Sequence, residues 1–320
     1  MNYTHLTQEE RYQIMEWLGD GYSLTYIAKQ LNRHKSTISR EIKRNRGERG
    51  YRPYQAHDNA QARRERNRNA REIEPEVWAK VEELIRLDWS PEQVEGSLKK
   101  ISHERIYLHV YQDKRQGGDL YRHLRLLRKR RKRYKSNQRR SGPIKNRRTL
   151  LERPSEVEAR QRIGDWEGDT VRGKHDQYGV VTLVERKSQY VILRKVESRT
   201  AKATREEIEA AFQGLEKMVH SITFDNGLEF AEHERMEEAL NAKIYFADPY
   251  CAWQRGLNEQ VNGLLRQYFP KGQSLKDITN EELVRVMNLL NHRPRKKLGF
   301  RTPHDVLNKS AKRRGVALRT

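Results

Sequence analysis

Three acidic residues in the second half of the chain have the chemistry that phosphoryl transfer requires. They are Asp169, Asp225 and Glu259. Carboxylate oxygens are hard ligands, which suit Mg²⁺ or Mn²⁺ better than cysteine or histidine does. Two such ions about 3.5–4 Å apart can activate an attacking oxygen and stabilise the leaving oxygen at phosphorus. Three crowded carboxylates repel one another unless a cation is bound, so a site built from them predicts divalent metal.

The elements predicted around these acids would bring them together. Alternating or β-branched segments predict strands, and helical spacing predicts helices, in the order βββαβαβα over residues 164–171, 178–185, 189–196, 202–213, 221–224, 232–241, 243–246 and 256–268. This is the order of the RNase H-like fold, a mixed α/β sheet with helices on its faces. Asp169 lies in the first strand, Asp225 follows the fourth, and Glu259 lies near the start of the last helix.

Spacing alone leaves the choice of acid open. Asp165 and Glu167 share a strand face with Asp169, and Glu229 and Asp248 lie close by in the sequence. Any one of these acids taken alone is more often a surface charge or a helix cap than a metal ligand.

The last predicted helix adds a basic residue to the same face. Glu259, Asn262 and Arg266 fall at positions i, i+3 and i+7, which share one helix face across two turns. Arg266 is thereby placed to hold a DNA phosphate beside the metal site.

Residues 1–46 predict a helix-turn-helix domain. Thr7 and Ser23 are helix caps, and a third helix follows the turn at residues 32–34. Ile38 and Ile42 face inward. The outward residues, which suit phosphates and base edges, are Lys35, Ser36, Thr37, Ser39, Arg40, Lys43 and Arg44. The alternative is a three-helix bundle with a solvated basic face.

A second helical unit is predicted over residues 73–118. Ser90 and Ser102 are placed to cap its two later helices. His103, Arg105 and Tyr107 are then left for DNA contacts. A helical hairpin that serves only for packing or dimerisation explains the same pattern nearly as well.

The charge distribution separates the remaining parts of the chain. The net charge is +22, but residues 156–305 carry 24 basic and 24 acidic side chains. Residues 1–155 carry 37 basic and 20 acidic side chains, and residues 306–320 carry five basic and none acidic. We therefore expect basic linkers at 47–72 and 119–155, a catalytic domain at 156–305 and a basic tail at 306–320, with DNA as the partner.

Composition excludes several other classes of protein. The single cysteine, Cys251, excludes an internal disulfide and a cysteine-based zinc site. No apolar stretch approaches the roughly 20 residues of a membrane span, and there is no signal-peptide core. The sequence thus predicts a protein of the cytoplasm, associated with the nucleoid, without an organic cofactor.

Several longer segments lie along essentially the whole chain: LTQEERYQI, SLTYIAKQLNRHKSTISREIKRN, WSPEQVEGSLKK, SHERIYLHVY, IGDWEGDTVRGK, ITFDNGLEF, DPYCAWQRGLNEQVNGLLRQYFPKG and NHRPRKKLGFRTPHDVL. Together they resemble transposases of the insertion-sequence family called IS-thirty, within the DDE transposases and retroviral integrases. The resemblance implies that Asp169, Asp225 and Glu259 are the catalytic and metal-binding acids. The last two are separated by 33 residues, as the family requires. Arg266 matches the family's basic residue seven positions after the glutamate.

The resemblance also implies a reaction. The N-terminal helix-turn-helix would bind the terminal inverted repeats of a mobile element. Water, or a freed 3′-hydroxyl, would then attack phosphodiester bonds. The cofactor would be Mg²⁺ (or Mn²⁺), with two ions per site. The element ends would be joined into a circular or tandem intermediate, which is then inserted into target DNA. Synapsis of two ends predicts a homodimer or larger assembly.

Three other functions fit parts of the sequence. A non-catalytic DNA-binding repressor explains residues 1–150 but leaves the three acids without a role. A metal-dependent nuclease shares the acids and differs in strand joining. An RNA-binding protein fits the charge, but the sequence carries no RNP-type or KH-type motif.

Overall fold

The computed structural model describes residues 5–48, 50–69, 73–125, 144–174, 177–248 and 251–316. Its contacts divide the chain into two units, residues 1–75 and residues 76–320.

The first unit contains the predicted helix-turn-helix. Helices α1 (Gln8–Gly19), α2 (Leu24–Gln30) and α3 (Lys35–Asn45) surround Ile14, Ile27 and Ile38, none of which is exposed to solvent. The Thr7 side chain accepts a hydrogen bond from the Glu10 amide, and that of Ser23 accepts one from the Tyr26 amide. Both predicted caps are therefore confirmed.

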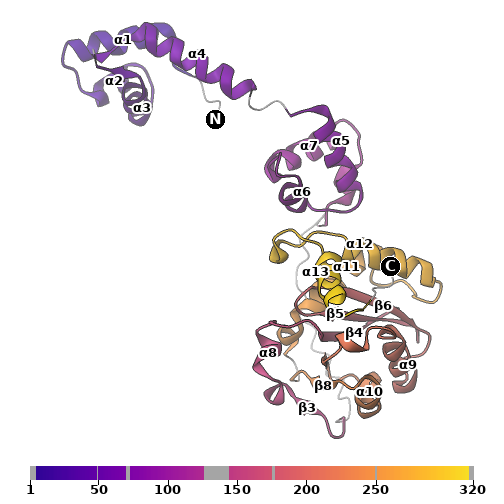
Figure 1. Ribbon diagram of the computed structural model, residues 1–320. Coiled ribbons are helices and arrows are strands. Elements are labelled where there is room, and N and C mark those ends of the chain that lie inside the picture. Colours follow the sequence, from indigo (N-terminus) through magenta and orange to yellow (C-terminus); the bar gives the residue numbers. More distant parts are fainter. Residues whose placement is uncertain are drawn as a thin grey trace. The chain divides into compact units, whose positions relative to one another are not determined.

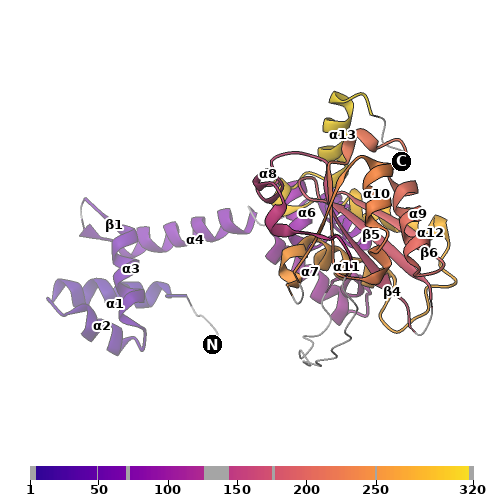
Figure 2. The same ribbon diagram turned by 90° about the horizontal axis from the view of Figure 1, so that it is seen from below.

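The expectation of a basic linker over residues 47–72 is wrong for most of that stretch. After the short strands β1 (Arg46–Gly47) and β2 (Gly50–Tyr51), helix α4 (Pro53–Asn69) packs on α1 and α3 and extends beyond them (Figure 2). Ala56 is fully buried, and Arg63 Nη2 donates to Asn45 Oδ1 at 3.0 Å. The highly charged sequence of α4 gives no sign of these few contacts. The helix has no apolar face and is stabilised by its tertiary packing.

The second unit begins with helices α5 (Pro75–Arg86), α6 (Pro91–Leu98) and α7 (His103–Arg115), followed by the 3₁₀ turn η1 (Leu120–His123). Ser90 and Ser102 cap α6 and α7 as predicted. Helix α6 packs against a segment that lies 201 residues later at Pro294. Gln93 Nε2 donates to the Pro294 carbonyl at 2.7 Å, and a Cβ atom at Gly96 would overlap the ring of Phe300. These helices therefore belong to the same compact unit as the sheet.

A six-stranded mixed sheet forms the centre of this unit. Its strands are β3 (Arg148–Thr149), β4 (Asp165–Arg172), β5 (Gly179–Glu185), β6 (Val191–Val196), β7 (Ser221–Phe224) and β8 (Lys243–Phe246). Their order is β3-β8-β7-β4-β5-β6, with β4, β5 and β6 antiparallel and β4, β7, β8 and β3 parallel. The five predicted strands are confirmed. The sixth, β3, shows that the linker expected at 119–155 already contributes to the sheet near its end.

Helices cover both faces of the sheet (Figure 1). Helices α9 (Ala201–Ala211) and α10 (His233–Leu240) pack on one face, and α11 (Gly256–Tyr268) and α12 (Asn280–Asn291) pack on the other. The short helical segments are η2 (Leu150–Glu152), α8 (Ser155–Glu158), η3 (Glu216–Met218), η4 (Leu228–Phe230), η5 (Ala252–Arg255) and η6 (Lys296–Leu298). This is an RNase H-like fold, as the order of elements predicts.

The expected basic tail at 306–320 is also partly wrong. Helix α13 (Pro303–Arg313) crosses the predicted boundary at residue 305, and Leu307 and Ala311 are buried in the core beside α9 and α10. Residues one helical turn apart share a face, so two apolar side chains suffice to attach a helix whose other faces are charged. Across the described part of the chain, no helix is long and apolar enough to cross a membrane.

Candidate active site and DNA-binding surfaces

Neighbouring parallel strands bring the first two acids to one place. Asp169 lies in β4, and Asp225 directly follows β7, which pairs with β4. On the opposite face of β4, Gly168 leaves room for the ring of Phe224, which a Cβ atom there would overlap. The strand order thus places two carboxylates from residues 56 positions apart in the sequence side by side.

One guanidinium bridges these two carboxylates. Arg255 Nη1 lies 3.5 Å from Asp169 Oδ1, and Arg255 Nη2 lies 3.4 Å from Asp225 Oδ2. Arg255 Nη1 also donates to the Gly168 carbonyl at 3.2 Å. Desolvation raises the pKa of Asp225 and the nearby Asp169 raises it further, whereas Arg255 lowers it. The two acids therefore face a common position that favours positive charge.

Asn262 fixes the orientation of Asp169. Its Nδ2 donates to Asp169 Oδ2 at 2.7 Å, and its Oδ1 accepts from Thr182 Oγ1 at 3.1 Å. Because both ends of the amide are engaged, Asn262 holds the carboxylate in one rotamer. The helical spacing predicts that Asn262 shares a face with Glu259, but it does not predict that Asn262 orients Asp169.

Glu259 is not brought into the carboxylate pair. Its side chain is exposed in the first turn of α11, and within the described residues that side chain makes no hydrogen bond or ion pair. Nor do those residues contain any group of three or more histidines, cysteines and acids arranged to hold a metal ion. Glu259 nevertheless shares α11 with Asn262 and lies four residues after Arg255, so the helix connects it to the site.

Arg266 binds the chain itself. Its Nη2 donates to the Arg172 carbonyl at 2.8 Å and its Nη1 to the Phe269 carbonyl at 3.4 Å. Burial lowers its pKa. In this structure Arg266 therefore joins the end of β4 to α11.

The four acids left open by spacing all have partners elsewhere. Arg162 pairs with Asp165, Arg186 with Glu167, Arg172 with Glu229, and Gln254 bonds to Asp248. Three of these charges are thus compensated by a guanidinium, and Asp248 accepts a hydrogen bond from a neutral amide. Among the six candidate acids of this domain outside α11, only Asp169 and Asp225 share one guanidinium with each other.

The predicted DNA-contacting residues of the first unit lie along α3. Lys35, Ser39, Arg40, Lys43 and Arg44 are exposed, and Ser36 and Thr37 are half-buried. Arg40 Nε donates to the Ser36 carbonyl at 3.1 Å, which holds its side chain along the helix. Lys35, Ser36 and Thr37 form the first turn of α3, which is the second helix of the helix-turn-helix. The N-terminal residues of that helix are the ones that contact base edges.

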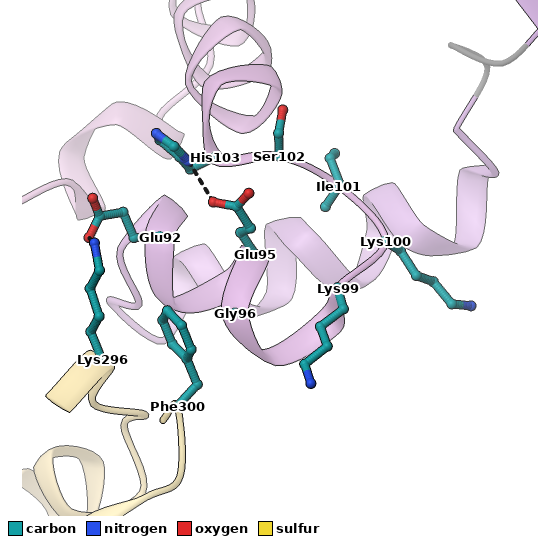
Figure 3. Close-up of a pocket in the computed structure, with 10 residues that line it drawn as sticks. All are labelled: Glu92, Glu95, Gly96, Lys99, Lys100, Ile101, Ser102, His103, Lys296 and Phe300. Atoms are coloured by element: carbon teal, nitrogen blue, oxygen red, sulfur yellow. Dashed lines mark hydrogen bonds and ion pairs between the residues drawn. The ribbon is translucent and has the colours of Figure 1, made fainter. Parts of the chain in front are cut away.

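The second helical unit presents a cavity at the turn between α6 and α7. It has a volume of about 670 Å³ and is lined by residues that include Lys99, Lys100, Lys296 and Phe300 (Figure 3). His103 Nδ1 lies 2.5 Å from Glu95 Oε2, so this predicted DNA contact is paired within the unit. Arg105 is exposed, and Tyr107 is half-buried and stacks on Tyr111.

Comparisons with known proteins agree with both halves of the chain. Residues 2–45 match the helix-turn-helix domain family, and residues 159–252 match the integrase core domain family. The chain is 36% identical over 320 residues to the transposase for insertion sequence element IS4351 of Bacteroides fragilis, covering 98% of each protein. It is 37% identical over 336 residues to the transposase InsI for insertion sequence element IS30C of Escherichia coli K12, covering 98% of this chain and 85% of that protein. It is 35% identical over 322 residues to the transposase for insertion sequence element IS1086 of Cupriavidus metallidurans, covering 95% of this chain and 94% of that protein.

These matches coincide with the structural elements. The first matched segment contains α1 to α3, and the second contains β4 to β8. Because similarity to the relatives extends over nearly the whole chain, it includes the helical region between these segments as well. An integrase core of this kind implies a DNA-binding enzyme of the DDE type, a polynucleotidyl transferase that depends on divalent metal. The chain belongs to the IS30 (IS-thirty) family of insertion-sequence transposases.

Proposed function

We propose that Asp169, Asp225 and Glu259 are the metal ligands of this transposase, and that the metal is Mg²⁺ or Mn²⁺ as two ions per site. The observation that carries the proposal is the Arg255 guanidinium between Asp169 and Asp225. Two carboxylates that face one cation, with only oxygen donors, fit a hard divalent ion. When bound, such ions activate the attacking oxygen and stabilise the leaving oxygen at phosphorus.

Asn262, Glu259 and Arg266 each have a separate role in this proposal. Asn262 keeps Asp169 oriented toward the site, as its hydrogen bond at 2.7 Å supports. Glu259 completes the ligand set from the first turn of α11. Arg266 donates to two backbone carbonyls. It would bind a DNA phosphate as well, because a guanidinium has five N–H donors.

DNA recognition is assigned to the two helical units. The residues Lys35, Ser36, Thr37, Ser39, Arg40, Lys43 and Arg44 of α3 would read the terminal inverted repeats. The residues His103, Arg105 and Tyr107 of α7 would add contacts to the same DNA or to the target. The lysines around the turn before α7 support this assignment, because positive charge at that turn attracts phosphate.

The reaction requires two DNA ends at once, so we propose a homodimer or larger assembly on DNA. Cleavage at both ends followed by joining would give a circular or tandem-end intermediate before insertion. The place of action would be the cytoplasm, at the nucleoid.

The test is strand cleavage and joining on labelled DNA that carries the element's own ends, with Mg²⁺, for wild type and Glu259→Gln. The matched control is Glu281→Gln, an exposed glutamate in the first turn of α12. We expect wild type and the control to cut and join, and Glu259→Gln to bind DNA without doing either. If wild type binds but never cuts with any divalent metal, the alternative of a non-catalytic repressor replaces this proposal.

A further inference from the structure

Glu167 is a buried carboxylate that contacts the start of the helix carrying Glu259. It lies in β4 with none of its surface exposed, two residues before Asp169 and on the same strand face. Its Oε2 accepts hydrogen bonds from the amides of Leu257 at 3.2 Å and Asn258 at 3.4 Å. These are the two residues immediately before Glu259.

Helix α11 lacks a cap of its own. Its N-cap residue, Arg255, makes no side-chain capping hydrogen bond and points instead to Asp169 and Asp225. The first amides of a helix have no acceptor within the helix, and the positive end of the helix dipole favours a negative group there. Glu167 supplies that group from the neighbouring strand.

The other oxygen of Glu167 is held by Arg186. Arg186 Nη1 lies 2.7 Å from Glu167 Oε1, and its Nε donates to the Val157 carbonyl at 3.2 Å. Arg186 is itself 2% exposed, so the two charges form a buried pair. This pairing compensates the charge of Glu167 and fixes its carboxylate, while the second oxygen stays directed at α11.

We propose that Glu167 is a positioning residue that fixes the first turn of α11 against β4 and thereby sets the position of Glu259 relative to Asp169. This inference rests on the proposed role of Glu259 as a metal ligand. Residues that orient metal ligands without touching the metal typically change metal affinity or activity by about 10–100-fold when they are replaced.

The neighbouring strand offers a matched control. Glu185 in β5 is also fully buried and also accepts backbone N–H groups, those of Gly164 at 3.1 Å, Lys187 at 3.1 Å and Ser188 at 2.6 Å. Its partners lie in the turn after β5 and just before β4, and none lies in α11. Replacing Glu185 therefore removes a buried carboxylate that accepts backbone N–H groups in the same sheet, and it leaves every contact to α11 in place.

The experiment compares full-length wild type, Glu167→Gln and Glu185→Gln. Hydrogen exchange of residues 254–262 is measured without metal, and Mn²⁺ affinity and DNA affinity are measured by titration. We expect Glu167→Gln to speed exchange in the first turn of α11 and to weaken Mn²⁺ binding about 10–100-fold with DNA affinity unchanged. Glu185→Gln should lower thermal stability but leave α11 exchange and Mn²⁺ affinity as in wild type.

Two results would overturn the inference: exchange in α11 that is unchanged in Glu167→Gln, or effects on α11 and Mn²⁺ that are the same in both variants. The exchange measurement needs no metal, so it still tests Glu167 if wild type binds no Mn²⁺ and the proposed ligand set fails.

If Glu167→Gln does not fold, the double variant Glu167→Gln with Arg186→Met replaces it. Removing both members of a buried ion pair is often close to neutral for stability. The double variant is then expected to show the same faster exchange and weaker Mn²⁺ binding, and wild-type behaviour in it would overturn the inference.

Discussion

The guanidinium of Arg255 lies 3.4 Å from the carboxylate of Asp225, Nη2 to Oδ2. The same group reaches Asp169 and the carbonyl of Gly168. A cation that belongs to the protein therefore sits between two acids that we assign to metal, and it relieves their mutual repulsion when metal is absent. Binding of a divalent ion there requires this guanidinium to move.

Arg255→Met should strengthen Mn²⁺ binding and lower the melting temperature of the metal-free protein. The substitution removes the competing cation and leaves Asp169 and Asp225 facing each other. Because Asp225 is partly exposed, we expect an effect of up to about 1 kcal/mol, or about fivefold in affinity. Titration with Mn²⁺ and thermal unfolding in a chelator measure the two changes. Arg172→Met, which removes a nearby cation paired with Glu229, is the control. Weaker Mn²⁺ binding in Arg255→Met would contradict the competition.

Asn262→Ala should weaken metal binding and slow cleavage without loss of DNA affinity. The hydrogen bond to Asp169 disappears, and Asp169 gains rotamers that point away from the site. A change of about 10–100-fold in Mn²⁺ affinity is expected, together with about 1 kcal/mol of stability. Gln260→Ala, on an exposed position of the same helix, should leave both measurements unchanged. Normal Mn²⁺ affinity in Asn262→Ala would show that Asp169 is oriented by other means.

Arg40→Ala should weaken recognition of the element ends while metal binding stays intact. Arg40 is exposed on α3, and a lost base contact costs about 1–3 kcal/mol on the specific sequence alone. Gel-shift titrations on end DNA and on random DNA of equal length make the comparison. An equal loss on both would mean that Arg40 contacts phosphate and reads no base.

His220 should make the folded protein sensitive to acid. Burial lowers its pKa, and the nearby Arg314 and Arg162 lower it further. The unfolded chain therefore binds a proton more readily, so the stability contributed by the neutral ring is complete above about pH 6.5 and is lost as the pH falls below that value. Thermal unfolding between pH 8 and pH 5 should show a smaller decline for His220→Gln than for wild type. Parallel curves for the two proteins would exclude this role.

The catalytic strands and helices were predictable because their patterns are local. The β-branched run GVVTLVE marks β5, and the caps at Thr7, Ser23 and Ser90 mark helix starts by themselves. Helix α13 also carried a signal, since Thr302 caps it and Pro303 occupies its first turn, but its basic composition concealed that signal.

The contacts within the site were not predictable in the same way. The position of Arg255 depends on how the chain enters α11. The partner of Glu167, Arg186, lies 19 residues away in the turn after β5. Residue type and spacing identified which acids could act, whereas the pairing of Asp165, Glu167, Glu229 and Asp248 with other side chains appeared only in three dimensions. Helix α4 likewise shows no apolar face, so only its tertiary contacts reveal it.

The alternation of β4 has a consequence for how such enzymes can diverge. Glu167 and Asp169 turn toward α11 and Arg255, while Trp166 and Gly168 turn toward the aromatic core at Phe212 and Phe224. Inserting or deleting one residue within this short motif would exchange the two faces, placing the indole among the carboxylates and a carboxylate in the core. The Trp-Glu-Gly-Asp stretch can therefore diverge by substitution, whereas a change in its length would break the site and the core together.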